Sequence, residues 1–169
     1  MQDVQLTPTS YVVLGLLSLA GEATPYDLKQ SVAQSVGYFW AIPHSQLYAE
    51  PARLAKAGYA QEKRERGGRR RRHYSLTERG RKALEAWAAA PPEGSWELRD
   101  PGLLKLFFGA DPATLAQQQL EMHGRRLAEY EALLAGAGPG VAPGPLLALE
   151  AGIGHEREYV RFWKRIAAG

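Results

Sequence analysis

Residues 64–80 read RERGGRRRRHYSLTERG, in which six arginines surround a glycine pair and an apolar alternation follows. A Gly-Gly pair readily adopts the positive φ angles of a tight hairpin turn. After the arginines, Tyr74 and Leu76 alternate with polar residues, as in a half-buried strand. The sequence therefore predicts a β-hairpin that turns at Gly67 and Gly68. The four arginines after the turn would alternate between the two faces of its second strand.

Two helix starts precede this hairpin. Thr7-Pro8 combines an N-cap residue with proline at the first helical position, which predicts a helix over residues 8–20 that ends at Gly21. Thr24-Pro25 repeats the signal and predicts a second helix. The inward-facing residues of the two helices would be Val13, Leu16, Leu17, Ala20, Leu28, Val32 and Val36.

A third helix precedes the hairpin and a fourth follows it. The third is predicted from Ser45, taken as its N-cap, through Ala57. Pro51 lies inside it and predicts a bend, because proline lacks a backbone donor and crowds the preceding turn. Thr77 caps the fourth helix, which ends before the proline pair at residues 91–92. Inward-facing residues would be Leu47, Leu54 and Ala55 in the third helix, and Leu84 and Trp87 in the fourth.

Three helices, a hairpin and a further helix are the element order of a winged helix-turn-helix. An isolated two-stranded hairpin is marginally stable, so it must pack against the preceding helices. In such a domain the third helix enters the major groove and the hairpin reaches phosphates beside it. The N-terminal end of the third helix would read bases through His44, Ser45 and Gln46, since glutamine can bond adenine bidentately. Arg53 and Lys56 would support binding from further along the helix.

The second half of the chain predicts a helical hairpin. Residues 91–110 read as a connector with a short helix capped by Asp100, and a long helix follows Asp111. A coiled-coil-like seam in that helix comprises Ala116, Leu120, His123, Leu127, Tyr130 and Leu134. The last helix, residues 145–167, carries two apolar stripes: Leu146, Leu149, Ile153, Val160 and Trp163, and then Tyr159, Phe162 and Ile166. One antiparallel neighbour cannot cover both, so a second copy, or the first or fourth helix of the same chain, would cover the remainder.

Composition narrows the function classes. The chain has 169 residues and no cysteine, which excludes disulfides and thiolate chemistry. Residues 1–85 hold 13 basic and 8 acidic residues, whereas residues 86–169 hold 8 and 10, so a polyanion would bind the first half. Neither a signal peptide nor a membrane span is indicated, which favours a soluble cytoplasmic protein. No nucleotide-binding, GxSxG or metal motif occurs, and His123 reads as a packed seam histidine. We therefore predict no enzyme activity and no cofactor or metal.

Several segments resemble the PadR-type transcriptional regulators. They are YDLKQSV in the second helix, SQLYAEPARLAKAGY in the third, and GGRRRRHYSLTERG in the hairpin. LRDPGLLKLFFG and the following residues resemble the C-terminal domain of the longer branch, which is described as similar to virulence activators. The chain departs from the family pattern in one place. Ala49 follows Tyr48 where proline is usual, and the proline comes at Pro51 instead.

The resemblance implies further roles for particular residues. It assigns phosphate contact to Tyr26 and phosphate or groove contact to Tyr48. It also implies a homodimer joined through the C-terminal helices, and a small aromatic or drug-like effector. Candidate effector-binding aromatics are Phe39, Trp40, Trp87 and Trp96, with Trp163 as a further candidate.

We therefore predict a mainly α fold with a small β-hairpin: a winged helix-turn-helix over residues 1–90, a connector over 91–110 and a helical dimerisation domain over 111–169. The predicted function is ligand-responsive repression through a pseudo-palindromic operator in double-stranded DNA. The predicted DNA-binding residues are Tyr26, His44, Ser45, Gln46, Tyr48, Arg53, Arg69, Arg70, Arg71 and Arg72. The predicted dimer contacts are Leu120, Leu127, Leu134, Leu149, Ile153, Val160 and Trp163. The alternative is a winged-helix module whose basic hairpin binds an acidic protein partner.

Overall fold

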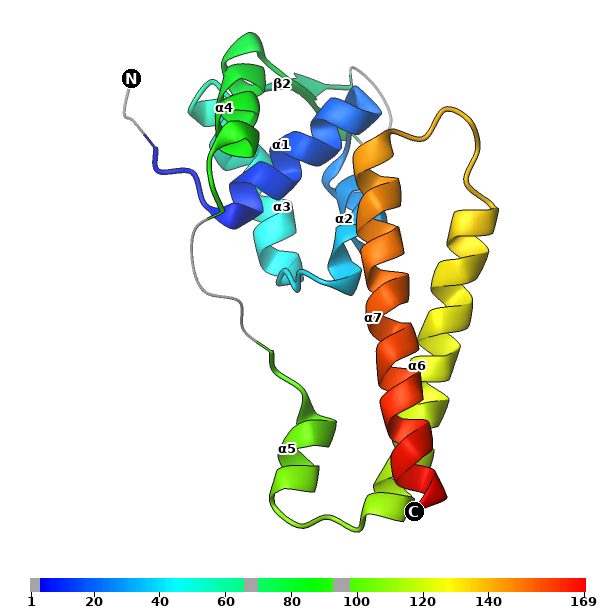
Figure 1. Cartoon of the computed structure of the whole chain (residues 1–169). Coiled ribbons are helices and arrows are strands. Elements are labelled where there is room, and N and C mark those ends of the chain that lie inside the picture. Colours follow the sequence, from blue (N-terminus) through cyan, green and yellow to red (C-terminus); the bar gives the residue numbers. More distant parts are fainter. Residues whose placement is uncertain (1–3, 66–69, 93–97) are drawn as a thin grey trace. The chain divides into compact units, whose positions relative to one another are not determined.

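The structure is a computed structural model that describes residues 4–65, 70–92 and 98–169 (Figure 1). The chain divides into two compact units, Met1–Gly94 and Ser95–Gly169. Helices dominate both, and the first unit adds a small antiparallel sheet, as the sequence predicted. Within the described residues, no helix combines the length and apolar character needed to span a bilayer.

The first two helices begin where the threonine-proline pairs predict. In α1 (Pro8–Ala20) the Thr7 side chain accepts a hydrogen bond from the Ser10 backbone amide, and Gly21 ends the helix with φ of 76°. In α2 (Pro25–Ala33) Thr24 plays the same capping role. Each cap satisfies a backbone donor that has no partner within the helix.

The inward faces of these helices differ in detail from the prediction. Ala20 is exposed, and Leu14 is completely buried in its place, because the buried stripe of α1 follows residues 10, 13, 14 and 17. Val36 is only half-buried, because α2 ends at Ala33 and Val36 begins a short 3-10 helix, η1 (Val36–Tyr38).

The third helix, α3 (His44–Lys56), begins earlier than predicted. Pro43 occupies the N-cap position and makes no side-chain cap, so the prediction of a Ser45 cap is wrong. The helix continues through Pro51, which lies on the buried face with Leu47 and Leu54. The proline ring therefore serves as a core side chain, at the cost of one hydrogen bond within the helix.

The hairpin belongs to a three-stranded antiparallel sheet of order β1-β3-β2. Its strands are β2 (Ala60–Arg64) and β3 (Arg72–Leu76), and β1 (Glu22–Ala23) pairs with the other side of β3. The predicted two-stranded hairpin is thus incomplete, because two residues are too few to show a strand periodicity. Arg72 starts β3, so the prediction that all four arginines alternate along one strand is wrong. Gly67, Gly68 and Arg69 lie outside the described residues.

The fourth helix, α4 (Glu78–Ala89), is capped by Thr77 as predicted. Leu84 packs against the core of the first unit. Trp87 does not point inward: its side chain is 51% exposed and stacks on the Tyr11 ring at 4.7 Å between ring centroids. An aromatic at helical spacing looks the same in the sequence whether it enters the core or lies flat on a neighbouring ring.

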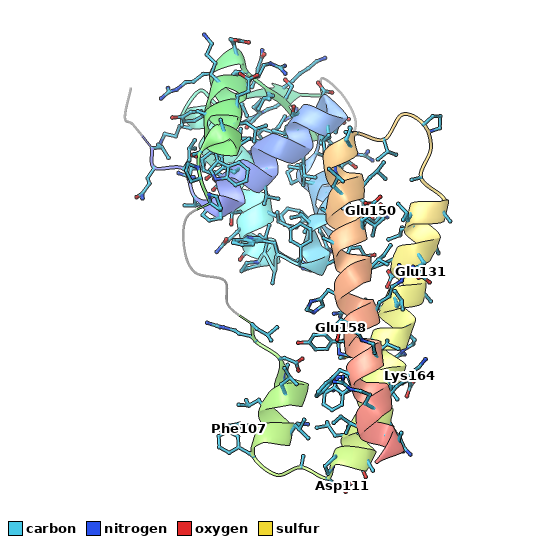
Figure 2. The ribbon with its side chains drawn as sticks, in the orientation of Figure 1. Phe107, Asp111, Glu131, Glu150, Glu158 and Lys164 are labelled. Carbon is cyan, nitrogen blue, oxygen red and sulfur yellow. The ribbon has the colours of Figure 1, made fainter. Side chains whose placement is uncertain are left out.

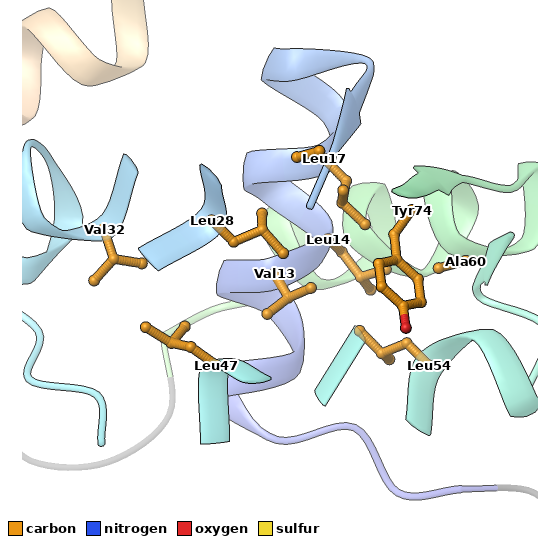
Figure 3. Close-up of a cluster of buried hydrophobic side chains, with 10 residues drawn as sticks. Val13, Leu14, Leu17, Leu28, Val32, Leu47, Leu54, Ala60 and Tyr74 are labelled. Carbon is orange, nitrogen blue, oxygen red and sulfur yellow. The ribbon is translucent and has the colours of Figure 1, made fainter. Parts of the chain in front are cut away.

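One hydrophobic core holds the first unit together (Figure 3). It draws side chains from α1, α2, α3 and the sheet, so α3 and the hairpin share a single support. The hairpin contributes Tyr74, which is almost completely buried. The labelled core residues are Val13, Leu14, Leu17, Leu28, Val32, Leu47, Leu54, Ala60 and Tyr74.

The second unit consists of α5 (Pro101–Phe107), α6 (Pro112–Ala135) and α7 (Pro143–Ala168). Asp100 caps α5 as predicted, and Asp111, after which the long helix was predicted to begin, caps α6. In Figure 1, α6 and α7 run side by side as an antiparallel pair. At 1.5 Å per residue they are about 36 and 39 Å long.

The predicted α6 seam divides into two sets. Ala116, His123 and Tyr130 are buried, whereas Leu120, Leu127 and Leu134 are only half-buried. The second stripe of α7 finds a partner that the sequence analysis did not consider, which is α5. Its members Tyr159, Phe162 and Ile166 pack in one cluster with Leu103, Leu106, Ala110, Leu115, Ala116, Leu120 and Trp163.

Candidate nucleic-acid interface

The N-terminal end of α3 presents three exposed polar side chains, those of His44, Ser45 and Gln46. The opposite side of the helix is held in the core by Leu47 and Leu54. Because the helix is amphipathic, its anchored face fixes which residues remain available to a partner. The structure therefore brings the three predicted base-reading residues to one free helix end.

Arg53, predicted to help bind DNA, makes several hydrogen bonds within the protein. Its guanidinium binds Glu50 through Nη2 at 2.6 Å and Nε at 2.8 Å, and Nη2 also donates to the Ser10 hydroxyl. Nη1 donates to the carbonyl oxygen of Gln5. These bonds connect α3 to α1 and to the segment before it. Arg53 thus supports the position of the helix.

Glu50 is the buried centre of this network. It also accepts a hydrogen bond from the Ser10 hydroxyl at 2.6 Å, and only 8% of the residue is exposed. Burial raises the pKa of its carboxyl group, but the hydrogen bonds from Arg53 and Ser10 outweigh burial and lower the pKa below 4.5. This network could not be predicted from the sequence, since a glutamate in a helix gives no signal of burial.

A neighbouring contact holds Gln46. The Thr9 hydroxyl of α1 donates to Gln46 Oε1 at 3.0 Å. The sequence analysis did not single out Thr9 or Ser10. Both residues lie in the first turn of α1. That position indicates a contact with α3 only when α3 is known to pass beside α1.

The two predicted phosphate-binding tyrosines are accessible. Tyr26 in the first turn of α2 is 57% exposed and Tyr48 on α3 is 48% exposed. Gln30 Nε2 donates to the Tyr26 hydroxyl at 3.0 Å, which leaves that hydroxyl free to donate outward. Both rings thus offer a phenol to a phosphate oxygen.

The hairpin displays its arginines near its tip. Arg70 and Arg71 precede β3 and are exposed, and Arg70 has a positive φ of 48°. The Glu65 amide donates to the Arg71 carbonyl oxygen at 3.0 Å, so the ladder continues past the strand ends. Among the described residues, no ion pair joins Arg70 or Arg71 to a carboxylate. Their guanidinium groups are therefore available to an anionic partner.

Carboxylates neutralise cations on the strands just below the hairpin tip. Glu62 pairs with Arg64 at 2.6 Å and lies 3.9 Å from Arg72. The hydrogen bond from Arg64 is the main reason why the pKa of Glu62 is lowered. His73 lies between Glu22 and Glu65, at 3.3 and 3.0 Å. Arg72 is thus less available to DNA than Arg70 and Arg71, a difference that the run of arginines does not show.

Comparisons with known proteins identify two family domains in this chain. The transcriptional regulator PadR-like family matches residues 13–86, and the virulence activator alpha C-terminal family matches residues 98–168. The negative transcriptional regulator PadR of Bacillus subtilis is 28% identical over 94% of both chains. This chain therefore combines a PadR-like domain with a virulence activator alpha C-terminal domain.

Two solved structures extend the comparison. The crystal structure of Bacillus subtilis PadR in complex with operator DNA is 26% identical and has a TM-score of 0.82, covering 94% of this chain and 96% of that one. The structure of the same regulator in complex with p-coumaric acid is 24% identical, with a TM-score of 0.75 and 97% of both chains covered. The winged-helix fold and the DNA-binding regulatory function predicted from the sequence are thus confirmed.

The candidate effector-binding aromatics of this PadR-like protein occupy different settings. Phe39 and Trp40 lie exposed after η1, and Trp87 stacks on Tyr11. Trp163 is completely buried in the second unit, where it packs against Leu115 and Ala116. Trp96 lies outside the described residues.

The predicted dimer contacts of the PadR-like chain fall into two groups. Ile153 and Trp163 are buried within the protomer, whereas Leu120, Leu127, Leu134, Leu149 and Val160 are half-buried.

Two open grooves expose part of the second group. One, of about 490 Å³, is lined by Leu127 and Val160, and the other, of about 640 Å³, by Leu134 and Ile153. Lys164 marks the first groove and Glu131 the second in Figure 2, and Arg157 lines both.

His123, a residue of the predicted α6 seam, forms a buried pair with Glu156 of α7. Its Nδ1 lies 2.6 Å from Glu156 Oε2, and both residues are buried between α6 and α7. This confirms the packed, hydrogen-bonded histidine that the sequence predicted. Within the described part of the chain, no group of three or more His, Asp or Glu residues could hold a metal ion.

Proposed function

We propose that this PadR-like protein is a cytoplasmic homodimeric repressor that binds a pseudo-palindromic operator and releases it when a small aromatic effector binds. The observation that carries this proposal is the likeness to Bacillus subtilis PadR in complex with operator DNA, which spans 94% of the chain. We assign DNA binding to residues 1–90, a connector to residues 91–110, and dimerisation to residues 111–169.

Two copies of α3 would enter successive major grooves about 34 Å apart. His44, Ser45 and Gln46 would face base edges, because they lie at the exposed N-terminal end of the helix. Tyr26 and Tyr48 would contact phosphates through their exposed hydroxyls. Phosphate contacts fix the position of the protein, whereas base contacts select the sequence.

The hairpin would lie along flanking phosphates. Arg70 and Arg71 are its principal cations, since they are exposed and make no ion pair with a described carboxylate. Arg72 would add a weaker contact because of Glu62. Arg53 would act indirectly, by fixing α3 through Glu50.

A mobility shift with the promoter DNA beside the protein's own gene tests the proposal. We expect retention at nanomolar protein that survives an excess of unrelated DNA, with one protected site of two half-sites in a footprint. Equal and weak retention of every sequence would contradict operator recognition. Addition of an effector should reduce retention of the operator.

The dimer would form through the half-buried leucines of α6 and their neighbours on α7. Leu127 and Val160 leave a mainly apolar groove open, and a twofold partner would present the same surface to it. The rim contributes Arg157, Arg161, Lys164 and Arg165. Polar rims around apolar centres are typical of protein interfaces.

The effector would be a small aromatic acid or a drug-like molecule, because Bacillus subtilis PadR has been solved with p-coumaric acid. Phe39, Trp40 and Trp87 offer exposed aromatic faces in the first unit. Quenching of tryptophan emission across a panel of phenolic acids tests this. Trp87→Phe and Trp40→Phe variants would identify the responding ring.

A further inference from the structure

The first turn of α1 contacts the N-terminal half of α3 through two consecutive residues. Thr9 donates its hydroxyl hydrogen to Gln46 Oε1 at 3.0 Å, and Ser10 donates to Glu50 Oε1 at 2.6 Å. Gln46 and Glu50 are four residues apart, so both lie on the flank of α3 that faces α1. The contact at Gln46 is open to solvent, whereas the contact at Glu50 is buried.

The buried contact between Ser10 and Glu50 holds Thr9 in place beside Gln46. Ser10 is completely buried, and Arg53 binds both Glu50 oxygens and the Ser10 hydroxyl. This network joins α1 to α3 one turn from Gln46. Because the backbones on both sides are fixed, the Thr9 hydroxyl stays beside the Gln46 side chain instead of meeting it by chance.

The bond orients an amide whose two ends differ chemically. The carboxamide of glutamine has an acceptor oxygen on one side and a donor NH₂ group on the other. With Oε1 directed to Thr9 on α1, the Nε2 group of Gln46 is directed away from α1. Gln46 then offers two donor hydrogens to a base edge, and its oxygen is turned aside.

This orientation distinguishes the two purines. Bidentate binding of adenine needs the glutamine oxygen and nitrogen together, one for the N6 amino group and one for N7. Guanine instead presents two acceptors, N7 and O6, which suit a lone NH₂ group. A Gln46 amide held by Thr9 should therefore favour guanine, whereas a freely rotating amide can turn to adenine.

We propose that Thr9, which lies outside the DNA-facing helix, sets the base preference of Gln46 by holding its amide oxygen, so that guanine is favoured over adenine at one position of each half-site. The inference rests on the proposed function, because it requires α3 to read the operator. It makes Thr9 a positioning residue that changes sequence preference without touching DNA.

The test measures binding to operator variants that carry each of the four bases at every half-site position. The wild-type protein should prefer guanine to adenine at one position. Thr9→Val keeps the side-chain shape but removes the hydroxyl, so that preference should fall about tenfold there and nowhere else. Thr9→Ser keeps the hydroxyl and should retain the preference for guanine. A wild-type preference for adenine or cytosine at the Gln46 position would overturn the proposal.

A double-mutant cycle separates this role from a general one. In a Gln46→Ala background, Thr9→Val should no longer change the base profile, since no amide remains to orient. An unchanged profile in Thr9→Val alone, or an effect that persists without Gln46, would overturn the proposal while operator binding itself stands. Loss of selectivity in the wild-type protein would instead contradict the proposed function. Far-ultraviolet circular dichroism confirms that each variant is folded, and Thr9→Ala serves as a second hydroxyl deletion.

Discussion

Glu50 shows how one buried residue can support α3, the helix proposed to read DNA, from its inner side. It is buried, yet its carboxylate accepts hydrogen bonds from Arg53 and Ser10. These bonds stabilise the charged form in the folded protein and lower its pKa. A group whose pKa is lower in the folded state contributes stability above its unfolded pKa, and that contribution is lost as the pH falls through the folded value.

Glu50→Gln should therefore lower the free energy of unfolding by about 2 kcal/mol at neutral pH, because it leaves Arg53 without its counter-charge. The difference from wild type should shrink as the pH falls below the ordinary carboxyl pKa of about 4.5, which applies to the unfolded chain, and vanish below the lowered folded pKa, where the wild-type carboxyl is protonated too. Urea titrations at a series of pH values measure this. Glu85→Gln, which alters an exposed carboxylate on α4, should change stability little. A difference that does not vary with pH would contradict the assignment.

Gly80 is a second position where one residue decides the packing. A Cβ there would lie 2.0 Å from the carbonyl oxygen of Tyr59, and a backbone atom cannot move aside cheaply. Gly80→Ala should destabilise the first unit by about 3 kcal/mol, measured by thermal unfolding. The control is Gly15→Ala on α1, where a Cβ meets nothing within 4 Å. That change should stabilise by about 0.5 to 1 kcal/mol, because alanine favours helix.

At the scale of elements, the hairpin combines available cations at its tip with neutralised charges on the adjoining strands. Arg70→Ala with Arg71→Ala should weaken binding to every DNA sequence. Each lost phosphate contact lowers the slope of log K against log salt by about 0.9, so a dimer that loses four contacts should lose roughly 3.5. Fluorescence anisotropy in rising salt measures both quantities.

The matched control removes two exposed cations from the second unit, with Lys105→Ala and Arg125→Ala. It should leave the slope unchanged. Equal slopes for the two double variants would contradict phosphate contact by the hairpin tip. Gln46→Ala offers a contrast, because it should weaken binding only at its cognate base, by about 1 to 3 kcal/mol.

Most elements could be predicted from the sequence because their ends carry local chemistry. Threonine-proline pairs mark α1 and α2, Thr77 marks α4, and aspartates mark α5 and α6. The start of α3 was misplaced because it has no side-chain cap. Strand β1 was missed because its two residues are defined by pairing with β3. Local signals predict local structure, and features that exist only through distant partners leave no such signal.

The same limit applies to the site. The exposed helix end and the basic hairpin follow from amphipathic spacing and composition. The roles of Arg53 and Arg72 do not, because they depend on Glu50 and Glu62 lying within reach. The Thr9 contact with Gln46 spans 37 residues of sequence. The sequence therefore predicts the type of DNA-binding surface, but it does not show which arginines are available to contact DNA.

At the scale of the whole molecule, α6 and α7 leave apolar grooves that a twofold partner would cover. Leu127→Lys with Val160→Lys would place charge in the first groove, beside the cations of its rim. Light scattering should show the mass of a monomer, and operator affinity should fall by about a hundredfold because two half-sites are no longer bound together. Met122→Lys, an exposed apolar position on α6, is the control. A double variant that stays dimeric would contradict this interface.

Helix α1 connects α3, which is proposed to enter the major groove, with the hairpin that is proposed to bind phosphates. Thr9 and Ser10 at its start bind α3, and Glu22 and Ala23, just after its end, pair with β3 of the hairpin. The 13-residue helix α1 thus links the position of α3 to that of the hairpin. A tilt of α1 would move α3 and the hairpin together. DNA affinity and sequence selectivity would therefore change together.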